Sequence, residues 1–160
     1  MNISIVRAES SHIHDCVSAV IHSEIGRVYG MSEDKMRNTL TRAMDSGEVF
    51  VAVDPQNHCL GFIRVALRGA FCRFPYLMLI AVNEACRGQG VGNRLLSFFE
   101  EIGFGEADRI FLLVSHFNTG ARRLYELLGY KSVGVLPDLV IKGVDEILMM
   151  KCRPEELPAV

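Results

Sequence analysis

Residues 87–92 have the sequence Arg-Gly-Gln-Gly-Val-Gly, a glycine spacing that could bind an anion. The segment follows an apolar run at residues 76–82, which suits a buried strand, and the apolar residues after it recur at helical spacing as far as Ile102. A helix start exposes unpaired backbone N–H groups and carries about half an elementary positive charge. Glycines also allow positive φ angles and a close approach to the ligand. The sequence therefore predicts a phosphate-binding loop between a strand and a helix.

The residues after this loop exclude two better-known nucleotide-binding motifs. A P-loop requires Gly-Lys followed by Ser or Thr, whereas Gly92 is followed by Asn93 and Arg94. A dinucleotide-binding fingerprint that begins at Gly88 requires a glycine at position 93, which is Asn. The remaining pattern, Arg-x-x-Gly-x-Gly, fits either another phosphate-binding loop or a structural turn.

A second informative block follows at residues 110–130. Residues 110–115 form an apolar run typical of a buried strand, and residues 118–129 then have the pattern of a capped helix. Asn118 suits the N-cap, and Gly129 stands where a helix needs a left-handed residue to end. The predicted buried face of this helix consists of Ala121, Leu124, Tyr125 and Leu128.

Together the two blocks resemble the GNAT superfamily of acetyl-CoA-dependent N-acetyltransferases. The loop is similar to the pyrophosphate loop of that family, and residues 118–130 match its second motif, Asn-x-x-Ala-x-x-Leu-Tyr-x-x-x-Gly-Phe/Tyr, at every marked position. The resemblance implies that acetyl-CoA is the cosubstrate. It implies cofactor contacts at Ile80, Ala81, Val82, Arg87, Gly88, Gln89, Gly90, Val91, Gly92, Asn93, Asn118 and Tyr125.

The rest of the chain supplies the elements that must position these motifs. We expect strands at residues 3–6, 49–53, 60–67, 76–82, 110–115, 130–136 and 146–152, and helices at 14–25, 32–47, 91–102 and 118–129. The fold class is α/β (α+β). The resemblance, which covers nearly the whole chain, implies a GNAT fold: a central mixed, mostly antiparallel sheet of about seven strands flanked by about four helices. Residues 1–160 are expected to form a single N-acetyltransferase (GNAT) domain.

Length, composition and charge limit the function further. The chain has 160 residues, 49% of them hydrophobic and 22% charged, which is enough for one domain with a buried core. Its formal net charge of −2 gives no generally basic surface, so we expect no nucleic acid partner. No segment has the pattern of a signal peptide or a membrane span, so we expect a cytoplasmic protein without membrane contact. The five cysteines form no Cys-x-x-Cys pair, and we expect them to be reduced and to bind no metal.

Acetyl transfer to an amine makes three chemical demands. An amine with a pKa near ~10.4 must lose a proton before it attacks a thioester. Backbone N–H groups must stabilise the oxyanion that forms, and the CoA thiolate must receive a proton. The resemblance assigns the oxyanion role to the strand end at residues 80–82 and the role of general acid to Tyr125. Since a tyrosine on the apolar face of a helix is often a core residue, both interpretations of Tyr125 stay open.

The sequence does not identify the general base. The glutamates of protein N-terminal and histone-type members correspond to Leu113 and Tyr76 in this chain. Possible substitutes are Tyr76, His116, Glu84 or an ordered water. Asp145 and Glu146, at the start of the last predicted strand, are expected to face solvent or to bind across the sheet.

Three functions are compatible with these residues. The first choice is an N-acetyltransferase that acetylates a primary amine of a small molecule by direct attack in a ternary complex. The alternatives are a protein N-terminal or lysine acetyltransferase, which the missing glutamate at position 113 disfavours, and a non-catalytic CoA-binding regulatory domain, which Tyr125 disfavours. The identity of the acceptor depends on the variable segments at residues 25–36 and 136–145. A homodimer is expected by analogy alone.

Overall fold

The framework of the protein is a seven-stranded sheet in the order β1-β2-β3-β4-β5-β7-β6, seen in a computed structural model that describes residues 2–155. The strands are β1 (Ser4–Arg7), β2 (Val49–Val53), β3 (Cys59–Ala70), β4 (Phe74–Val82), β5 (Arg109–Ser115), β6 (Lys131–Leu136) and β7 (Glu146–Cys152). Strands β4 and β5 run parallel, and the other neighbouring pairs among these strands are antiparallel. The expected mixed, mostly antiparallel sheet is confirmed.

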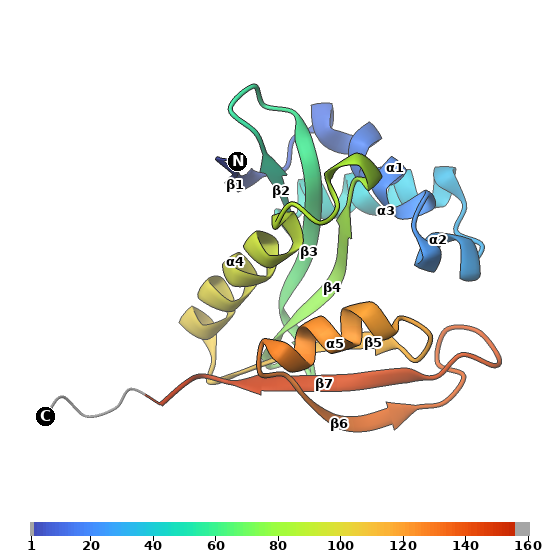
Figure 1. Ribbon diagram of the computed structural model, residues 1–160, viewed down its shortest axis with the longest axis vertical. Coiled ribbons are helices and arrows are strands. Elements are labelled where there is room, and N and C mark those ends of the chain that lie inside the picture. Colours follow the sequence, from blue (N-terminus) through green and yellow to red (C-terminus); the bar gives the residue numbers. More distant parts are fainter. Residues whose placement is uncertain (1, 156–160) are drawn as a thin grey trace, which may run out of the picture.

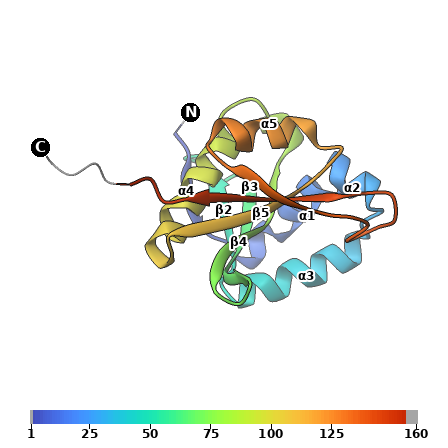
Figure 2. The same cartoon turned by 90° about the horizontal axis from the view of Figure 1, so that it is seen from below.

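Helices cover both faces of this sheet (Figure 1). They are α1 (Ile13–Ile21), α2 (Glu24–Val28), α3 (Glu33–Asp45), α4 (Val91–Glu106) and α5 (Thr119–Leu127), with short 3₁₀ helices η1 (Ser10–His12) and η2 (Glu84–Cys86). Figure 2 shows α5 on one side of the sheet and α3 on the other. No helix within residues 2–155 is both long enough and apolar enough to cross a membrane.

The helix expected at residues 14–25 is broken, which adds one short helix to the predicted four. The Ser23 hydroxyl ends one helix and caps the next, because it donates to the Val20 carbonyl at 2.6 Å and accepts from the Gly26 N–H at 3.0 Å. A Cβ on Gly26 would lie 2.2 Å from the Val20 carbonyl oxygen, so the close approach of α2 to the end of α1 requires glycine at this position. The break directs Tyr29, which follows α2, towards the ends of β5 and β7.

Two hydrophobic cores lie on opposite faces of the sheet. Strand β2 alternates between them: Val49, Val51 and Val53 pack with α1 and α3, whereas Phe50 and Ala52 pack on the side of α4 and α5. Because both faces of β2 are covered, its residues are apolar throughout rather than alternately apolar and polar.

Strands β4 and β5 separate soon after they meet, as Figure 1 shows. Their ladder joins Tyr76 to Phe111 and Leu77 to Leu112 and then stops. On its other side, β4 pairs with β3 through a register shift that passes over Met78, a bulged residue with 40% of its surface exposed. Beyond Leu77, the edge of β4 that faces β5 therefore has no strand partner, and its backbone polar groups are available to a ligand.

Candidate functional site

The backbone at the start of α4 forms a cradle of free N–H groups. Gly90 is the N-cap residue, has a φ of 84°, and has no side chain to cap the helix. The first bond of the helix runs from the Arg94 N–H to the Gly90 carbonyl at 3.0 Å. The N–H groups of Val91, Gly92 and Asn93 precede that bond and have no partner within residues 2–155. Together with the positive end of a 16-residue helix, they suit an anionic oxygen.

Side chains of the loop hold this cradle in place. Gln89 donates from Nε2 to the Ala85 carbonyl at 2.9 Å, and Arg87 donates from Nε to the Val82 carbonyl at 3.3 Å. The loop and Leu124 line a cavity of about 300 Å³, with the Arg87 guanidinium as its cation. Gln89 is not among the residues that line this cavity, and its hydrogen bond to Ala85 braces the loop. The free N–H groups and the Arg87 guanidinium give this cavity the positive character that a pyrophosphate group requires.

A second cavity, of about 330 Å³, continues from the loop between β4 and α5. Its walls include the unpaired edge of β4 at residues 79–82, the α5 residues Ala121, Leu124 and Tyr125, and residues 23–25 at the start of α2. We call it the donor cavity. The predicted cofactor residues Ile80, Ala81 and Val82 line it. Its exposed strand edge can pair with the amides of an extended ligand, as a neighbouring strand would.

Asn118 lies where β5 leads into α5. Its Oδ1 accepts a hydrogen bond from the Ala121 N–H at 3.2 Å, which confirms the predicted N-cap. The amide nitrogen of the same side chain has no partner within residues 2–155, and Asn118 lines the donor cavity. Asn118 can therefore cap the helix and donate a hydrogen bond to a ligand at the same time.

A third cavity, of about 210 Å³, adjoins the donor cavity at Tyr125, and we call it the acceptor cavity. It is enclosed by Tyr29 and Met31, by β4 from Tyr76 to Ile80, by the end of β5, and by Val140 and Glu146. The donor and acceptor cavities share five lining residues: Ile25, Leu79, Ile80, Asn118 and Tyr125. Two ligands, one in each cavity, would therefore meet beside Tyr125.

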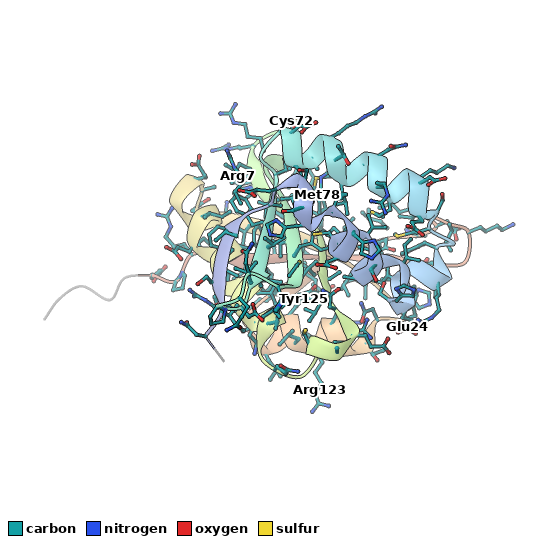
Figure 3. All side chains as sticks on the ribbon, turned by 90° about the horizontal axis from the view of Figure 1, so that it is seen from above. Arg7, Glu24, Cys72, Met78, Arg123 and Tyr125 are labelled. Carbon is teal, nitrogen blue, oxygen red and sulfur yellow. The ribbon has the colours of Figure 1, made fainter. Side chains whose placement is uncertain are left out.

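The Tyr125 side chain is 5% exposed, and its hydroxyl has no hydrogen-bond partner among residues 2–155. Its ring packs edge-on against Tyr130, with 5.9 Å between the ring centroids. Figure 3 shows that Arg123, two residues earlier on α5, points away from the molecule. Burial raises the pKa of Tyr125 to about 12, so the hydroxyl keeps its proton at neutral pH. An unpaired, protonated hydroxyl where two cavities meet is placed to donate a proton.

Glu146 is the buried acid of the acceptor cavity. It begins β7 opposite Ser115 and is 5% exposed. The Ser115 hydroxyl donates to Oε1 at 3.0 Å and lies 3.3 Å from Oε2, and the Tyr29 hydroxyl also donates to Oε1. The expectation that Glu146 faces solvent is wrong, whereas the alternative that it binds across the sheet is confirmed. Sequence reasoning missed Tyr29 and Ser115 because their meeting depends on the break before α2 and on the antiparallel register.

Of the three side chains that the sequence offered as a base, Tyr76 reaches the acceptor cavity. Burial raises the pKa of Tyr76, and the negative charge of Glu146 raises it further. His116 is exposed, and its Nδ1 accepts a hydrogen bond from the Asp145 N–H at 3.0 Å. Glu84 lies on the exposed helix η2 and lines neither the donor nor the acceptor cavity. The structure thus brings Tyr76 to the site and leaves His116 and Glu84 outside it.

Curated relatives share parts of this sequence. An uncharacterised N-acetyltransferase of Methanocaldococcus jannaschii is 38% identical over 81 residues, which cover 49% of this chain and 52% of the relative. An uncharacterised protein of Mycobacterium leprae is 31% identical over 109 residues, which cover 67% of this chain and 30% of that protein. The matches therefore span about half, or less, of the length of these relatives.

Solved structures share the fold. An acetyltransferase of the GNAT family from Bacillus cereus superimposes with a TM-score of 0.77 at 21% identity, covering 97% of this chain and 100% of that one. The yncA protein of Salmonella typhimurium, solved with its cofactor acetyl-CoA, superimposes with a TM-score of 0.72 at 18% identity, covering 100% and 99% of the two chains. The sequence model of the acetyltransferase (GNAT) family matches residues 19–130, which is more than half of the chain. This protein therefore belongs to the GNAT family of acetyltransferases.

Proposed function

We propose that this protein transfers the acetyl group of acetyl-CoA to a primary amine of a small molecule, by direct attack in a ternary complex within one catalytic domain. The observation that carries the proposal is the meeting of the donor and acceptor cavities at Ile80, Asn118 and Tyr125. One cavity continues into a cradle for phosphate, and the other ends at a buried carboxylate. Such an arrangement brings a phosphorylated donor and a basic acceptor together without a covalent enzyme intermediate.

The residues of the donor side fit acetyl-CoA. The N–H groups of Val91, Gly92 and Asn93 would hold the pyrophosphate, with Arg87 as the counter-charge. The unpaired edge of β4 and the free amide of Asn118 would pair with the pantetheine amides. When bound there, acetyl-CoA supplies an activated acyl group in the form of a thioester.

The chain's own groups then have two tasks beside the thioester. Backbone N–H groups at the unpaired edge of β4 would stabilise the negative charge that develops on the carbonyl oxygen. The Tyr125 hydroxyl would protonate the departing thiolate. Because a thiol has a pKa near ~8.5 and is already a tolerable leaving group, this protonation should contribute at the low end of general acid catalysis.

A thiol-release assay with acetyl-CoA tests the proposal. The purified protein should release CoA with small primary amines, among a panel that also contains polyamines, amino acids and peptides with free N-termini. Release with peptides alone would instead support a protein acetyltransferase. Thermal stabilisation by acetyl-CoA, without thiol release for any amine, would support a CoA-binding domain that does not turn over.

A further inference from the structure

The carboxylate of Glu146 lies in the acceptor cavity without a cationic partner. Glu146 is 5% exposed, and it forms no salt bridge with any Lys, Arg or His of residues 2–155. A buried charge without a counter-charge is costly, by several kcal/mol for an ion even after relaxation. A ligand that brings a positive charge into this cavity would remove that cost.

The two hydroxyls beside Glu146 leave part of its carboxylate free. Tyr29 and Ser115 each carry one hydroxyl proton, and an ionised carboxylate offers about four lone-pair sites. The two hydroxyls lie 2.6 Å apart, and the closest contact that each makes with Glu146 is to Oε1, whereas Oε2 has one contact, at 3.3 Å. Oε2 therefore keeps room for a further donor. Burial, with the hydrogen bond to Glu146, raises the pKa of Tyr29 to about 12, so Tyr29 stays a donor at neutral pH.

The rest of the acceptor cavity contains no positive side chain. Its described lining has no Lys, Arg or His, and the polar side chains that share it with Glu146 are Tyr29, Tyr76, Ser115, Asn118 and Tyr125. Met31, Leu113 and Val140 offer apolar surface for the carbon chain of a ligand. A carboxylate next to the reacting nitrogen would find no cation here and would be repelled by Glu146.

We infer that Glu146, oriented by Tyr29 and Ser115, binds the ammonium group of the acceptor, and that it selects amines with no carboxylate beside the reacting nitrogen. The inference rests on the proposed acetyl transfer and narrows its substrate class. The shared chemistry is a primary alkylammonium on an apolar stem, whether it belongs to a free amine or to the N-terminus of a peptide.

Proton transfer balances in this arrangement. The bound ammonium loses one proton to the Glu146 carboxylate, which later returns it to solvent. The free amine nitrogen then forms a C–N bond to the thioester carbon, the C–S bond breaks, and Tyr125 gives its proton to the thiolate. The second proton lost from nitrogen restores Tyr125, so the products are the amide, the thiol and one released proton.

Matched acceptors test the selection on the wild-type protein. Isoamylamine, leucinamide and leucine share a stem and differ in the group beside the nitrogen: hydrogen, a neutral amide or a carboxylate. We expect kcat/KM for isoamylamine to exceed that for leucine by roughly 100-fold or more, with leucinamide close to isoamylamine. A short peptide with N-terminal leucine distinguishes the two sources of the ammonium. Equal rates for leucine and isoamylamine would overturn the inference.

Variants test the residue itself. Glu146→Gln keeps the side chain's size and should lower kcat/KM for isoamylamine roughly 100-fold, through a raised KM for the amine and a lowered kcat, while the KM for acetyl-CoA stays unchanged. Its preference for isoamylamine over leucine should fall below about tenfold. Glu101→Gln, an exposed control on α4, removes the same charge and should leave all these values unchanged. An unaltered preference in Glu146→Gln would refute the role of Glu146.

Binding separates this inference from the proposed function. If no amine releases thiol, the proposed acetyl transfer is wrong. Calorimetry with CoA-saturated protein can then still compare the binding of isoamylamine with the binding of leucine. Binding of isoamylamine that is lost in Glu146→Gln would then support the ammonium site alone. Absence of binding for isoamylamine and leucinamide, or equal binding of leucine, would overturn it.

Discussion

Replacement of Gly92 by alanine should strengthen the fold and weaken the binding of acetyl-CoA. Gly92 is the second residue of α4, and a Cβ at this position would meet one atom within 4 Å, the Val82 Cγ2 at 3.8 Å. That distance is ordinary van der Waals contact, so the methyl group fits the protein. It would project at the wall shared by the donor cavity and the phosphate cradle.

The two effects have opposite signs and can be estimated. Alanine is more favourable than glycine in a helix by about 0.5–1 kcal/mol, which corresponds to a rise in Tm of about 1–4 °C for a chain of this size. A methyl group that displaces a phosphate oxygen from one N–H group would remove a hydrogen bond to a charged group, worth about 1.5–3 kcal/mol. The Kd for acetyl-CoA should therefore rise roughly tenfold to 150-fold.

Calorimetric titration with acetyl-CoA and urea unfolding measure the two quantities on the same sample. Gly105→Ala is the matched control, because it makes the same change in the same helix where a Cβ would meet no atom within 4 Å, and Gly105 lines none of the three cavities. It should raise stability without changing the Kd. A Gly92→Ala variant with raised stability and an unchanged Kd would refute the assignment of the loop to phosphate.

Three further predictions concern Tyr125 and Gly26. Tyr125→Phe should lower kcat at saturating acetyl-CoA by roughly tenfold to a few hundredfold, and an unchanged kcat in the thiol-release assay would exclude a general acid at this position. Because burial raises the pKa of Tyr125 from 10.0 to about 12, its protonated form stabilises the fold fully below pH 10, and this contribution is lost as the pH rises towards 12. Urea unfolding at pH 8 and pH 11 should thus show a loss of stability that is smaller in Tyr125→Phe than in the wild type by about 1 kcal/mol; equal losses would contradict this. Gly26→Ala should cost about 1–3 kcal/mol of stability and lower kcat/KM for amines, because its Cβ would force α2 and Tyr29 away from Val20; an unchanged unfolding curve and unchanged kinetics would show that the close approach is not required.

Much of the fold could be predicted from the sequence because its local patterns are strong. The apolar runs at residues 49–53 and 110–115 form strands within a residue of the predicted limits. Capping residues Asn118 and Ser32 mark helix starts correctly, since their side chains accept hydrogen bonds from the first turn. The predicted glycine loop likewise lies between a strand and the start of a helix.

The acceptor side could not be predicted because it depends on contacts between distant segments. Tyr29 and Glu146 are separated by 117 positions, and their contact requires both the break before α2 and the pairing of β7 with β5. An acidic residue at the start of a strand can face either side, and the sequence pattern alone does not decide which. The strand expected at residues 60–67 also continues to Ala70, because the reversal occurs at Phe71 and Cys72, two non-glycine residues with positive φ.

The central claim is that an acetyl donor and an amine acceptor occupy two cavities that meet at Tyr125. Initial rates measured over a matrix of acetyl-CoA and isoamylamine concentrations, with detection of the acetylated amine, test this claim most directly. The structure predicts that the double-reciprocal lines intersect, as they do when both substrates must be bound before transfer. Parallel lines with an acetyl group on the protein, or no acetylated amine at any concentration, would contradict the account.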